Sequence, residues 1–280
     1  KSADEGSEAV TIVFKDANMY KRVLAKISSK IQSSDSSTNT IKITQNNLDS
    51  ITSLSLNYSN DGIGKITDIS GIENFKNLTS LYLASNQITD ISLLKNSTKL
   101  TSLTVYGNQI VDISALENLV NLTSLSAYGN QITDISALKN LTKLTTLNLS
   151  SNKITNINSL KNLENLTSLY IYSNQITDIS ELKNLTKLTR LEMYSNKIEN
   201  IKSLENLTKL TYLTAYGNEI KDINALSNLT ELTTLYLSSN QITDISALKN
   251  LIKLTRLEIY NNKIENIKPL ENLTKLTHLS

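Results

Sequence analysis

Asparagine recurs at intervals of 22 residues through most of the chain. The marker residues are Asn86, Asn108, Asn130, Asn152, Asn174, Asn196, Asn218, Asn240 and Asn262. Apolar residues stand at fixed offsets around each of them, as Leu166, Leu169, Ile171 and Ile176 do around Asn174. A strict period constrains the fold more than composition does, because every copy must take up the same conformation and pack against its neighbours.

Written out, the unit is LxxLxLxxNxIxxIxxLxxLxx, which is the leucine-rich-repeat pattern. The LxL stretch has a period of two and predicts one short strand per repeat. A single repeat cannot bury its apolar side, whereas stacked repeats share one core. The pattern therefore predicts an α/β-type solenoid that is mostly β, curved, with a parallel sheet on its concave face. Twenty-two residues leave room only for short 3₁₀ or irregular segments on the convex face.

The marker asparagines are predicted to form a structural ladder. A side-chain amide both donates and accepts hydrogen bonds, so it can satisfy backbone groups that the bend after each strand leaves unpaired. A second polar position precedes the next Ile and is predicted to cap the turn that follows. Its residues are Asp90, Asp112, Asp134, Asn156, Asp178, Asn200, Asp222, Asp244 and Asn266.

The chain is predicted to have three parts: a flexible tail over residues 1–9, a helical N-terminal cap over 10–53, and repeats over 54–280. Within the cap, VFKDANMYKRVLAKISSKI predicts a helix with Asp16 as N-cap, and SSDSSTNT predicts a polar loop. The first repeat is longer than the others because it contains the loop NYSNDGIG. The last repeat stops inside a predicted strand, and we expect the parent protein to continue.

Whole blocks of repeats are nearly identical. Residues 130–147 and 240–257 differ at only two of eighteen positions. TRLEMYSNKIENIKSLENLTKL likewise returns 66 residues later as TRLEIYNNKIENIKPLENLTKL. Duplication of a block of several repeats is the simplest explanation.

The repeat NQITDISxLxNLTxL and the cap FKDANMYKRVLAKI…TQNNLDSITSLSL resemble the internalin family of Gram-positive surface proteins. The likeness covers roughly residues 10–280. It implies a secreted or cell-wall-attached protein of a Gram-positive bacterium that binds a protein ligand, such as a host cell-surface receptor, on its concave face. The chain departs from the family in having a single Pro in its repeats, Pro269, and in lacking the Ig-like domain that usually follows them.

Composition excludes several kinds of site. The net charge is +2, so no overall field favours nucleic acid, and no apolar run is long enough to insert into a membrane. The chain has no Cys and a single His, His278, which excludes thiol chemistry and a multi-histidine metal site. We therefore expect no metal and no cofactor.

Tyrosine gathers on the predicted concave face. The candidate partner-binding residues are Tyr82, Tyr106, Tyr128, Tyr170, Tyr172, Arg190, Glu192, Tyr194, Tyr212, Tyr216, Tyr236, Arg256, Glu258 and Tyr260. One interpretation is that Tyr suits strands and that neighbouring rings simply stack. The other is a recognition surface, because Tyr combines a large apolar body with a polar tip and is enriched at interfaces.

No arrangement of residues indicates catalysis, and the chain is predicted to be a non-enzymatic binding module. Arg190/Glu192 and Arg256/Glu258 are predicted to be ion pairs within one strand, because side chains two residues apart share a face. Two other functions stay open. One is an intracellular scaffold of the phosphatase-regulatory type, and the other is a glycan or cell-wall binder.

Overall fold

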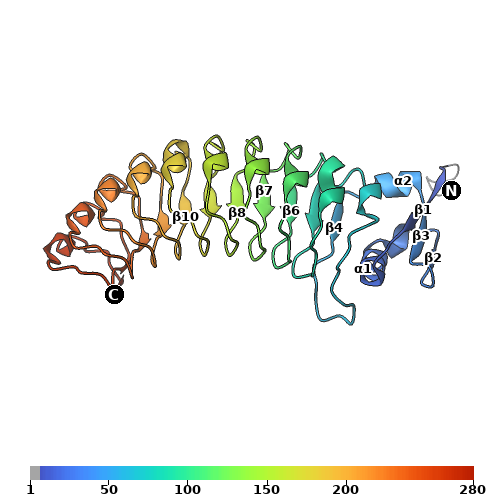
Figure 1. Ribbon diagram of the computed structural model, residues 1–280, viewed down its shortest axis with the longest axis horizontal. Helices are drawn as coiled ribbons and strands as arrows, with labels where there is room; N and C mark the ends of the chain where they lie inside the picture. Colours follow the sequence, from blue (N-terminus) through green and yellow to red (C-terminus); the bar gives the residue numbers. More distant parts are fainter. Residues whose placement is uncertain (1–6) are drawn as a thin grey trace. The chain divides into compact units, whose positions relative to one another are not determined.

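The structure is a computed structural model that describes residues 7–280 (Figure 1). It divides into two compact units, the first ending at Ile132 and the second covering Thr133–Ser280. Of the tail predicted over residues 1–9, residues 1–6 lie outside the described part. Ala9 already belongs to a strand.

The cap in the first unit combines helices with a small antiparallel sheet. Its elements are β1 (Ala9–Val13), α1 (Ala17–Ile27), η1 (Ser28–Lys30), β2 (Ser33–Asp35), β3 (Thr40–Thr44) and α2 (Gln45–Asp49). The helix predicted after Asp16 is confirmed, and it buries Met19 and Val23. The three-stranded sheet, in the order β1-β3-β2, was not predicted. The segment SSDSSTNT, interpreted as a loop, contains the exposed edge strand β2, whose polar residues give no alternating apolar signal.

The repeats of the first unit place one strand and one 3₁₀ segment in each turn. These elements are β4 (Ser53–Ser55), η2 (Ile72–Asn74), β5 (Ser80–Tyr82), η3 (Ser92–Asn96), β6 (Ser102–Thr104), η4 (Ser114–Leu116) and β7 (Ser124–Ser126). The strands pair in parallel, and from β5 to β7 each residue lies opposite the one 22 positions further on, as Leu81 lies opposite Leu103.

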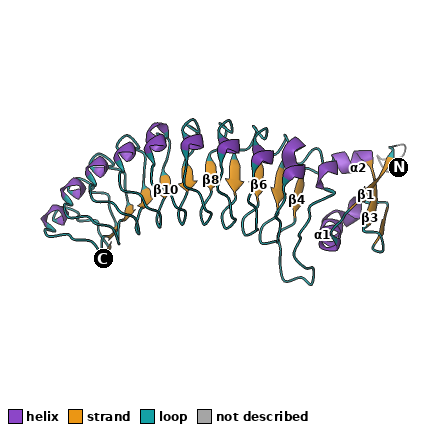
Figure 2. Ribbon diagram, viewed as in Figure 1, coloured by secondary structure: helices purple, strands orange, loops and turns teal. Residues whose placement is uncertain are grey.

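The second unit repeats the same arrangement. Its elements are η5 (Ser136–Leu138), β8 (Thr146–Asn148), η6 (Asn158–Leu160), β9 (Ser168–Tyr170), η7 (Ser180–Asn184), β10 (Arg190–Glu192), η8 (Lys202–Leu204), β11 (Tyr212–Thr214), η9 (Asn224–Leu226), β12 (Thr234–Tyr236), η10 (Ser246–Leu248), β13 (Arg256–Glu258), η11 (Lys268–Leu270) and β14 (His278–Leu279). Within the unit, strands and short helical segments alternate along the chain (Figure 2). The Leu and Ile side chains between these two layers form the core, where Leu191 and Ile198 are fully buried. The predicted parallel sheet with short 3₁₀ segments is confirmed.

The predicted ladder of asparagines is present. Asn174 Nδ2 donates to the carbonyls of Leu149 and Ile171 at 3.1 Å and of Tyr172 at 3.2 Å. Its Oδ1 accepts from the N–H of Ile154 at 3.0 Å. One buried amide thus satisfies backbone groups in its own repeat and in the preceding one.

The predicted caps are also confirmed where their bonds are recorded. Asp178 Oδ1, for example, accepts from the N–H of Ser180 at 2.8 Å, at the start of η7. Hydrogen bonds of this kind lower the pKa of the Asp178 carboxyl, so the cap stays ionised and keeps its acceptor capacity.

Replacing a ladder asparagine is expected to destabilise the fold strongly. Asn174→Ala leaves one buried N–H and up to three carbonyls without their partner, which costs about 1–3 kcal/mol in the free energy of unfolding. Urea unfolding measures this loss. Gln175→Ala is the control, because Gln175 is exposed and its replacement should be almost silent. If Asn174→Ala is as stable as Gln175→Ala, the asparagine ladder does not stabilise the fold as predicted.

The residue before each ladder asparagine has a left-handed backbone. Its φ lies between 53° and 67° at Ser85, Gly107, Gly129, Ser151, Ser173, Ser195, Gly217, Ser239 and Asn261. This conformation carries no penalty for glycine but strains a residue with a Cβ atom. A Cβ atom at Gly217 would meet Ser195 at ordinary contact distance, so the difference between the two residue types is one of backbone strain.

Exchanges at this position should therefore change stability in opposite directions. Ser195→Gly relieves the strain and, after the greater entropy of glycine in the unfolded chain is subtracted, should stabilise by about 0.5 kcal/mol. Gly217→Ser should destabilise by a similar amount. Chemical unfolding of the two variants beside the parent protein measures both. Two shifts of the same sign would show that strain at this position does not govern stability.

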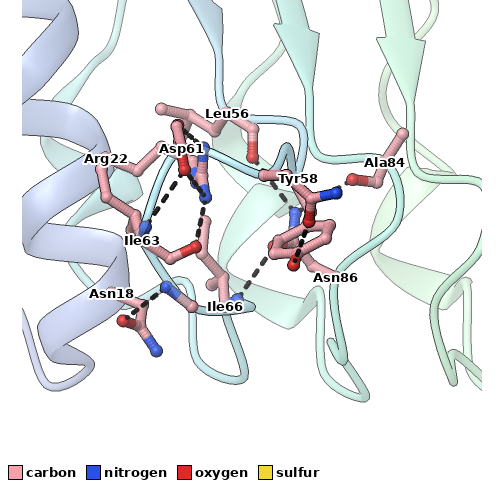
Figure 3. Close-up of polar contacts among 11 residues, drawn as sticks. Asn18, Arg22, Leu56, Tyr58, Asp61, Ile63, Ile66, Ala84 and Asn86 are labelled. Carbon is pink, nitrogen blue, oxygen red and sulfur yellow. Dashed lines mark hydrogen bonds and ion pairs between the residues drawn. The ribbon is translucent and has the colours of Figure 1, made fainter.

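The long loop of the first repeat joins the repeats to α1 (Figure 3). Arg22 of α1 is buried and donates to Asp61 Oδ2 at 2.9 Å and to the carbonyl of Ile63 at 3.0 Å. At the end of the loop, the N–H of Ile66 donates to Asn86 Oδ1 at 2.9 Å. The loop is thus held by the cap helix at Asp61 and Ile63, and the chain that follows it is held by the first ladder asparagine at Ile66.

Asp16 ties the cap to the repeats with both carboxylate oxygens. Oδ1 accepts from the N–H groups of Asn18 and Met19, as an N-cap does. Oδ2 accepts from the N–H and hydroxyl of Thr67 and from the N–H of Asp68. Burial acts to raise the pKa of Asp16, but the hydrogen bonds from Thr67, Asp68 and Asn18 outweigh it, so this pKa lies below its ordinary value.

The lowered pKa of Asp16 predicts a pH-dependent contribution to stability. A carboxyl whose folded-state pKa is depressed stabilises fully above its unfolded pKa of about 3.9 and loses that stabilisation as pH falls through the folded value. Asp16→Asn should be less stable than the parent protein at neutral pH, and the difference should shrink below about pH 4. Unfolding midpoints measured from neutral to acidic pH test this. A difference independent of pH would contradict it.

Candidate functional site

The strands expose one set of side chains on the side of the sheet that faces away from the core, here called the sheet face. In β10, Leu191 is buried while Arg190 and Glu192 lie on the sheet face. Parallel pairing in register aligns equivalent residues, so that Arg190 lies opposite Tyr212 and Glu192 lies opposite Tyr170. The sequence predicted this placement correctly.

Three tyrosines of the second unit form a continuous stack, here called the tyrosine row. The rings of Tyr172 and Tyr194 are 4.3 Å apart between centroids and inclined by 7°. Those of Tyr194 and Tyr216 are also 4.3 Å apart and are inclined by 11°. Each ring is half-buried. The rings therefore stack on one another, as the packing interpretation predicts.

Serine bounds the tyrosine row on both sides. The equivalent positions in the neighbouring repeats are Ser150 and Ser238, which are 0% and 1% exposed. Their hydroxyls have no hydrogen-bond partner within residues 7–280. Small buried residues at these two positions end the aromatic surface after three rings.

Two hydroxyls of the row, those of Tyr194 and Tyr216, have a pKa raised above the ordinary value. Burial raises the pKa of Tyr194 and of Tyr216, and the carboxylate of Glu192 acts in the same direction on both. The adjacent phenols of Tyr216 and Tyr172 also raise the pKa of Tyr194. Tyr194 and Tyr216 thus keep neutral phenols that can donate a hydrogen bond.

Arg190 lies between two tyrosines of neighbouring strands. Its guanidinium carbon is 3.8 Å from the ring centroid of Tyr212 and 5.8 Å from that of Tyr170. Arg190 Nε donates to Glu192 Oε2 at 2.8 Å, which confirms the predicted ion pair within the strand. The guanidinium is thus fixed by two rings and one carboxylate.

The second predicted pair, Arg256/Glu258, does not form. Arg256 Nε donates instead to the hydroxyl of Tyr236 at 3.0 Å. Glu258 Oε1 lies 3.0 Å from His278 Nε2, on the following strand. The same spacing as in Arg190/Glu192 was not sufficient to form the ion pair. Residues of the adjacent strands provide Arg256 and Glu258 with other partners.

The remaining candidates are distributed over both units. In the first unit, Tyr106 and Tyr128 stack at 4.4 Å, and Tyr82 lies on β5 without a ring contact among the described residues. In the second unit, Tyr212 and Tyr236 meet edge to face at 6.1 Å, while Tyr260 is 49% exposed. The tyrosine row is the longest ring stack within either unit of the described residues.

A threonine ladder borders the sheet face and was missed by the sequence analysis. The Oγ1 atoms of Thr101, Thr123, Thr167, Thr189, Thr211, Thr233, Thr255 and Thr277 each donate to the carbonyl of the threonine one repeat earlier, at 3.1–3.2 Å. Threonine at every twenty-second position was the available signal. Its role is structural, since it links successive repeats beside the strands.

A polar hollow lies away from the sheet face. It has a volume of about 780 Å³ and is lined at η7 and η8 by residues that include Asp178, Lys183, Lys202 and Glu205. Charges of both signs surround it. Over the described residues, no group of three or more His, Cys, Asp and Glu residues could hold a metal ion. No helix within residues 7–280 is long and apolar enough to cross a membrane.

Comparison with known proteins agrees with this architecture. The family model "Leucine Rich repeats (2 copies)" matches residues 76–118, 120–162, 164–206 and 208–250, more than half of the chain. No curated protein matches the chain. The internalin InlF of Listeria monocytogenes is 32% identical over 96% of this chain and 96% of its own, with a TM-score of 0.54.

Two further structures extend the likeness. The functional domain of InlJ from Listeria monocytogenes is 28% identical over 97% of this chain and 61% of its own, with a TM-score of 0.75. It is described as including a cysteine ladder, whereas this chain contains no cysteine. The plant peptide hormone receptor RGFR1, in complex with RGF2, is 25% identical over 75% of this chain and 40% of its own, with a TM-score of 0.64.

Repeats, ladder and parallel sheet together define a leucine-rich-repeat protein, a fold that serves as a scaffold for protein interactions. Within that class, the match to InlF over nearly the full length of both chains is decisive. The chain belongs to the internalin-like family.

Proposed function

We propose that the chain binds a protein partner through the sheet face of its second unit, with the tyrosine row at the centre of the contact. The observation that supports this most directly is the stack of Tyr172, Tyr194 and Tyr216 beside the immobilised Arg190. Tyr and Arg dominate the energetic centres of protein interfaces. Rings that are already ordered lose little conformational entropy when a partner binds.

The surroundings of the row also fit an interface. Small uncharged residues on the strands around the row include Ser168, which is half-buried, and Thr214 and Thr234, which are buried. A cluster of aromatic residues with one arginine nearby corresponds to the composition of binding centres in protein interfaces.

A protein is a better partner for this surface than a glycan. Sugars stack on the open faces of aromatic rings, but here the faces between Tyr172, Tyr194 and Tyr216 are occupied by one another. The row therefore presents ring edges and hydroxyls to a ligand. The other alternative, an intracellular scaffold of the phosphatase-regulatory type, is less consistent with the likeness to internalins.

The family relationship supports a location at the bacterial surface or in the medium. On that basis we propose that the partner is a protein of a host cell surface. The complex of RGFR1 with RGF2 is a case in which a related fold holds a polypeptide ligand. Peptides are therefore suitable probes for a first experiment.

A displayed library of random dodecapeptides, selected on the immobilised protein, provides the ligands for the test. Tyr172→Ser/Tyr194→Ser/Tyr216→Ser should weaken binding of the selected peptides by about 2 kcal/mol or more, roughly thirtyfold. The stacked rings also stabilise the fold, so this variant should have a lower unfolding midpoint than the parent protein. Tyr172→Phe/Tyr194→Phe/Tyr216→Phe keeps the stack and removes only the hydroxyls, and it should show an intermediate loss of affinity at nearly unchanged stability.

The control is Lys139→Ser/Lys183→Ser/Lys249→Ser, because these exposed lysines lie at or beside the 3₁₀ segments, and Lys183 lines the polar hollow. Binding to this control should equal that of the parent protein. If the triple lysine variant loses binding and Tyr172→Ser/Tyr194→Ser/Tyr216→Ser does not, the binding surface lies at the 3₁₀ segments. If no peptide is enriched, the proposed role of the sheet face in holding a polypeptide is wrong.

A further inference from the structure

We infer that the partner presents a carboxylate to Arg190, whose guanidinium forms a preorganised binding group at the side of the tyrosine row. This inference rests on the proposed function and specifies the chemistry of the partner. The carboxylate belongs either to an Asp or Glu side chain or to the C-terminus of a polypeptide. Both sources share the planar pair of oxygens that an arginine fork binds.

The first step in the argument is that Arg190 has unused donors. Its Nε is engaged by Glu192 at 2.8 Å, but Nη1 and Nη2 make no hydrogen bond within residues 7–280. The side chain cannot easily turn these donors elsewhere, because Tyr212 and Tyr170 hold the guanidinium between them. An arginine whose orientation is fixed before binding loses less entropy on forming two parallel hydrogen bonds.

The second step concerns which charge of the pair reaches the surface. The side chain of Glu192 is 12% exposed, whereas that of Arg190 is 39% exposed. Glu192 is therefore the covered member, and the guanidinium is the group that solvent and a partner meet. The pair is close to neutral overall, but its outer part offers hydrogen-bond donors only.

The third step is the lack of competing charge. On β9 and β11, the strands that pair with β10, the sheet-face residues are Ser168, Tyr170, Tyr212 and Thr214, none of which is charged, and Thr214 is buried. A carboxylate approaching Arg190 thus meets two tyrosine side chains and one guanidinium, and the charged group next to that guanidinium is the largely covered Glu192. A phosphate dianion is disfavoured, because a single guanidinium would have to balance two charges beside the carboxylate of Glu192.

The chain contains a matched control three repeats away. Arg256 stands at the equivalent place in β13, within the same TRLE sequence. It lacks the clamp, since its only recorded partner within the described residues is the hydroxyl of Tyr236. The side chains of Arg190 and Arg256 therefore allow the effect of preorganisation to be separated from that of charge.

Arginine signals provide a direct test, because the protein has only three arginines. With isotope-labelled arginine, the guanidinium resonances are followed by NMR while the peptide acetyl-Gly-Glu-Gly-amide is added. The Arg190 signals should shift in a saturable manner, and the Gln counterpart of the peptide should bind roughly tenfold more weakly. Acetyl-Gly-Gly-Gly with a free C-terminus tests the second source of carboxylate. Equal responses of Arg190 and Arg256, or no response of Arg190, would overturn the inference.

Peptides selected in the display experiment separate this inference from the proposed function. Binders should carry Asp, Glu or a free C-terminus at a fixed place. Arg190→Gln should weaken the acidic peptide about tenfold or more and leave its Gln-substituted counterpart unchanged, while Arg256→Gln affects neither. Arg190→Gln alone leaves the Glu192 carboxylate without its ion-pair partner, which could affect folding. The double variant Arg190→Gln/Glu192→Gln avoids this and should bind the peptides as the single variant does. Binders that depend on the tyrosine row but not on Arg190 would refute the inference and leave the proposed function standing. Binders that need neither would refute both.

Discussion

The asparagine ladder is the interaction on which the rest of the structure depends. After every strand the chain must bend, and the bend exposes backbone groups that no strand or helix can pair. Each Asn side chain supplies one acceptor and one forked donor, and in Asn174 these reach the backbone of two successive repeats. The bend therefore becomes a regular connection between repeats. The leucines can then stack at constant register, because every repeat returns the chain to the same starting point.

Constant register determines what the sheet face can carry. Residues at one position of the repeat lie side by side along the sheet. The same residue type in three successive repeats therefore forms a continuous strip. In this way Tyr172, Tyr194 and Tyr216 form a stack with a spacing of 4.3 Å, and Tyr170 and Tyr212 come to hold Arg190. Tyr170, Arg190 and Tyr212 occupy strand positions, while Tyr172, Tyr194 and Tyr216 each lie two residues beyond the end of a strand, next to the left-handed residue that precedes the ladder asparagine.

The sequence predicted those features that the period alone determines. The strands, the ladder, the Asp caps and the placement of the tyrosines all follow from spacing, and the N-cap at Asp16 follows from a local signal. Features that depend on contacts across strands were predicted less well. Arg190 pairs with Glu192 as expected, but Arg256 and Glu258 do not pair, because Tyr236 and His278 are adjacent to them. The sheet of the cap was missed because β2 is short, polar and exposed, so its sequence resembles that of a loop.

The unlike behaviour of the two TRLE copies has an evolutionary consequence. A duplicated block brings its residues to a new place but not the neighbours that gave them their contacts. Arg190 is clamped because the repeats on either side supply Tyr170 and Tyr212, whereas its copy Arg256 has Tyr236 in the preceding repeat but His278 in the following one. Gaining or losing a whole repeat would therefore create and abolish combinations of side chains at the junction without any point mutation. Recombination between near-identical blocks could diversify the ligands of such a protein while leaving the hydrophobic interior of every repeat unchanged.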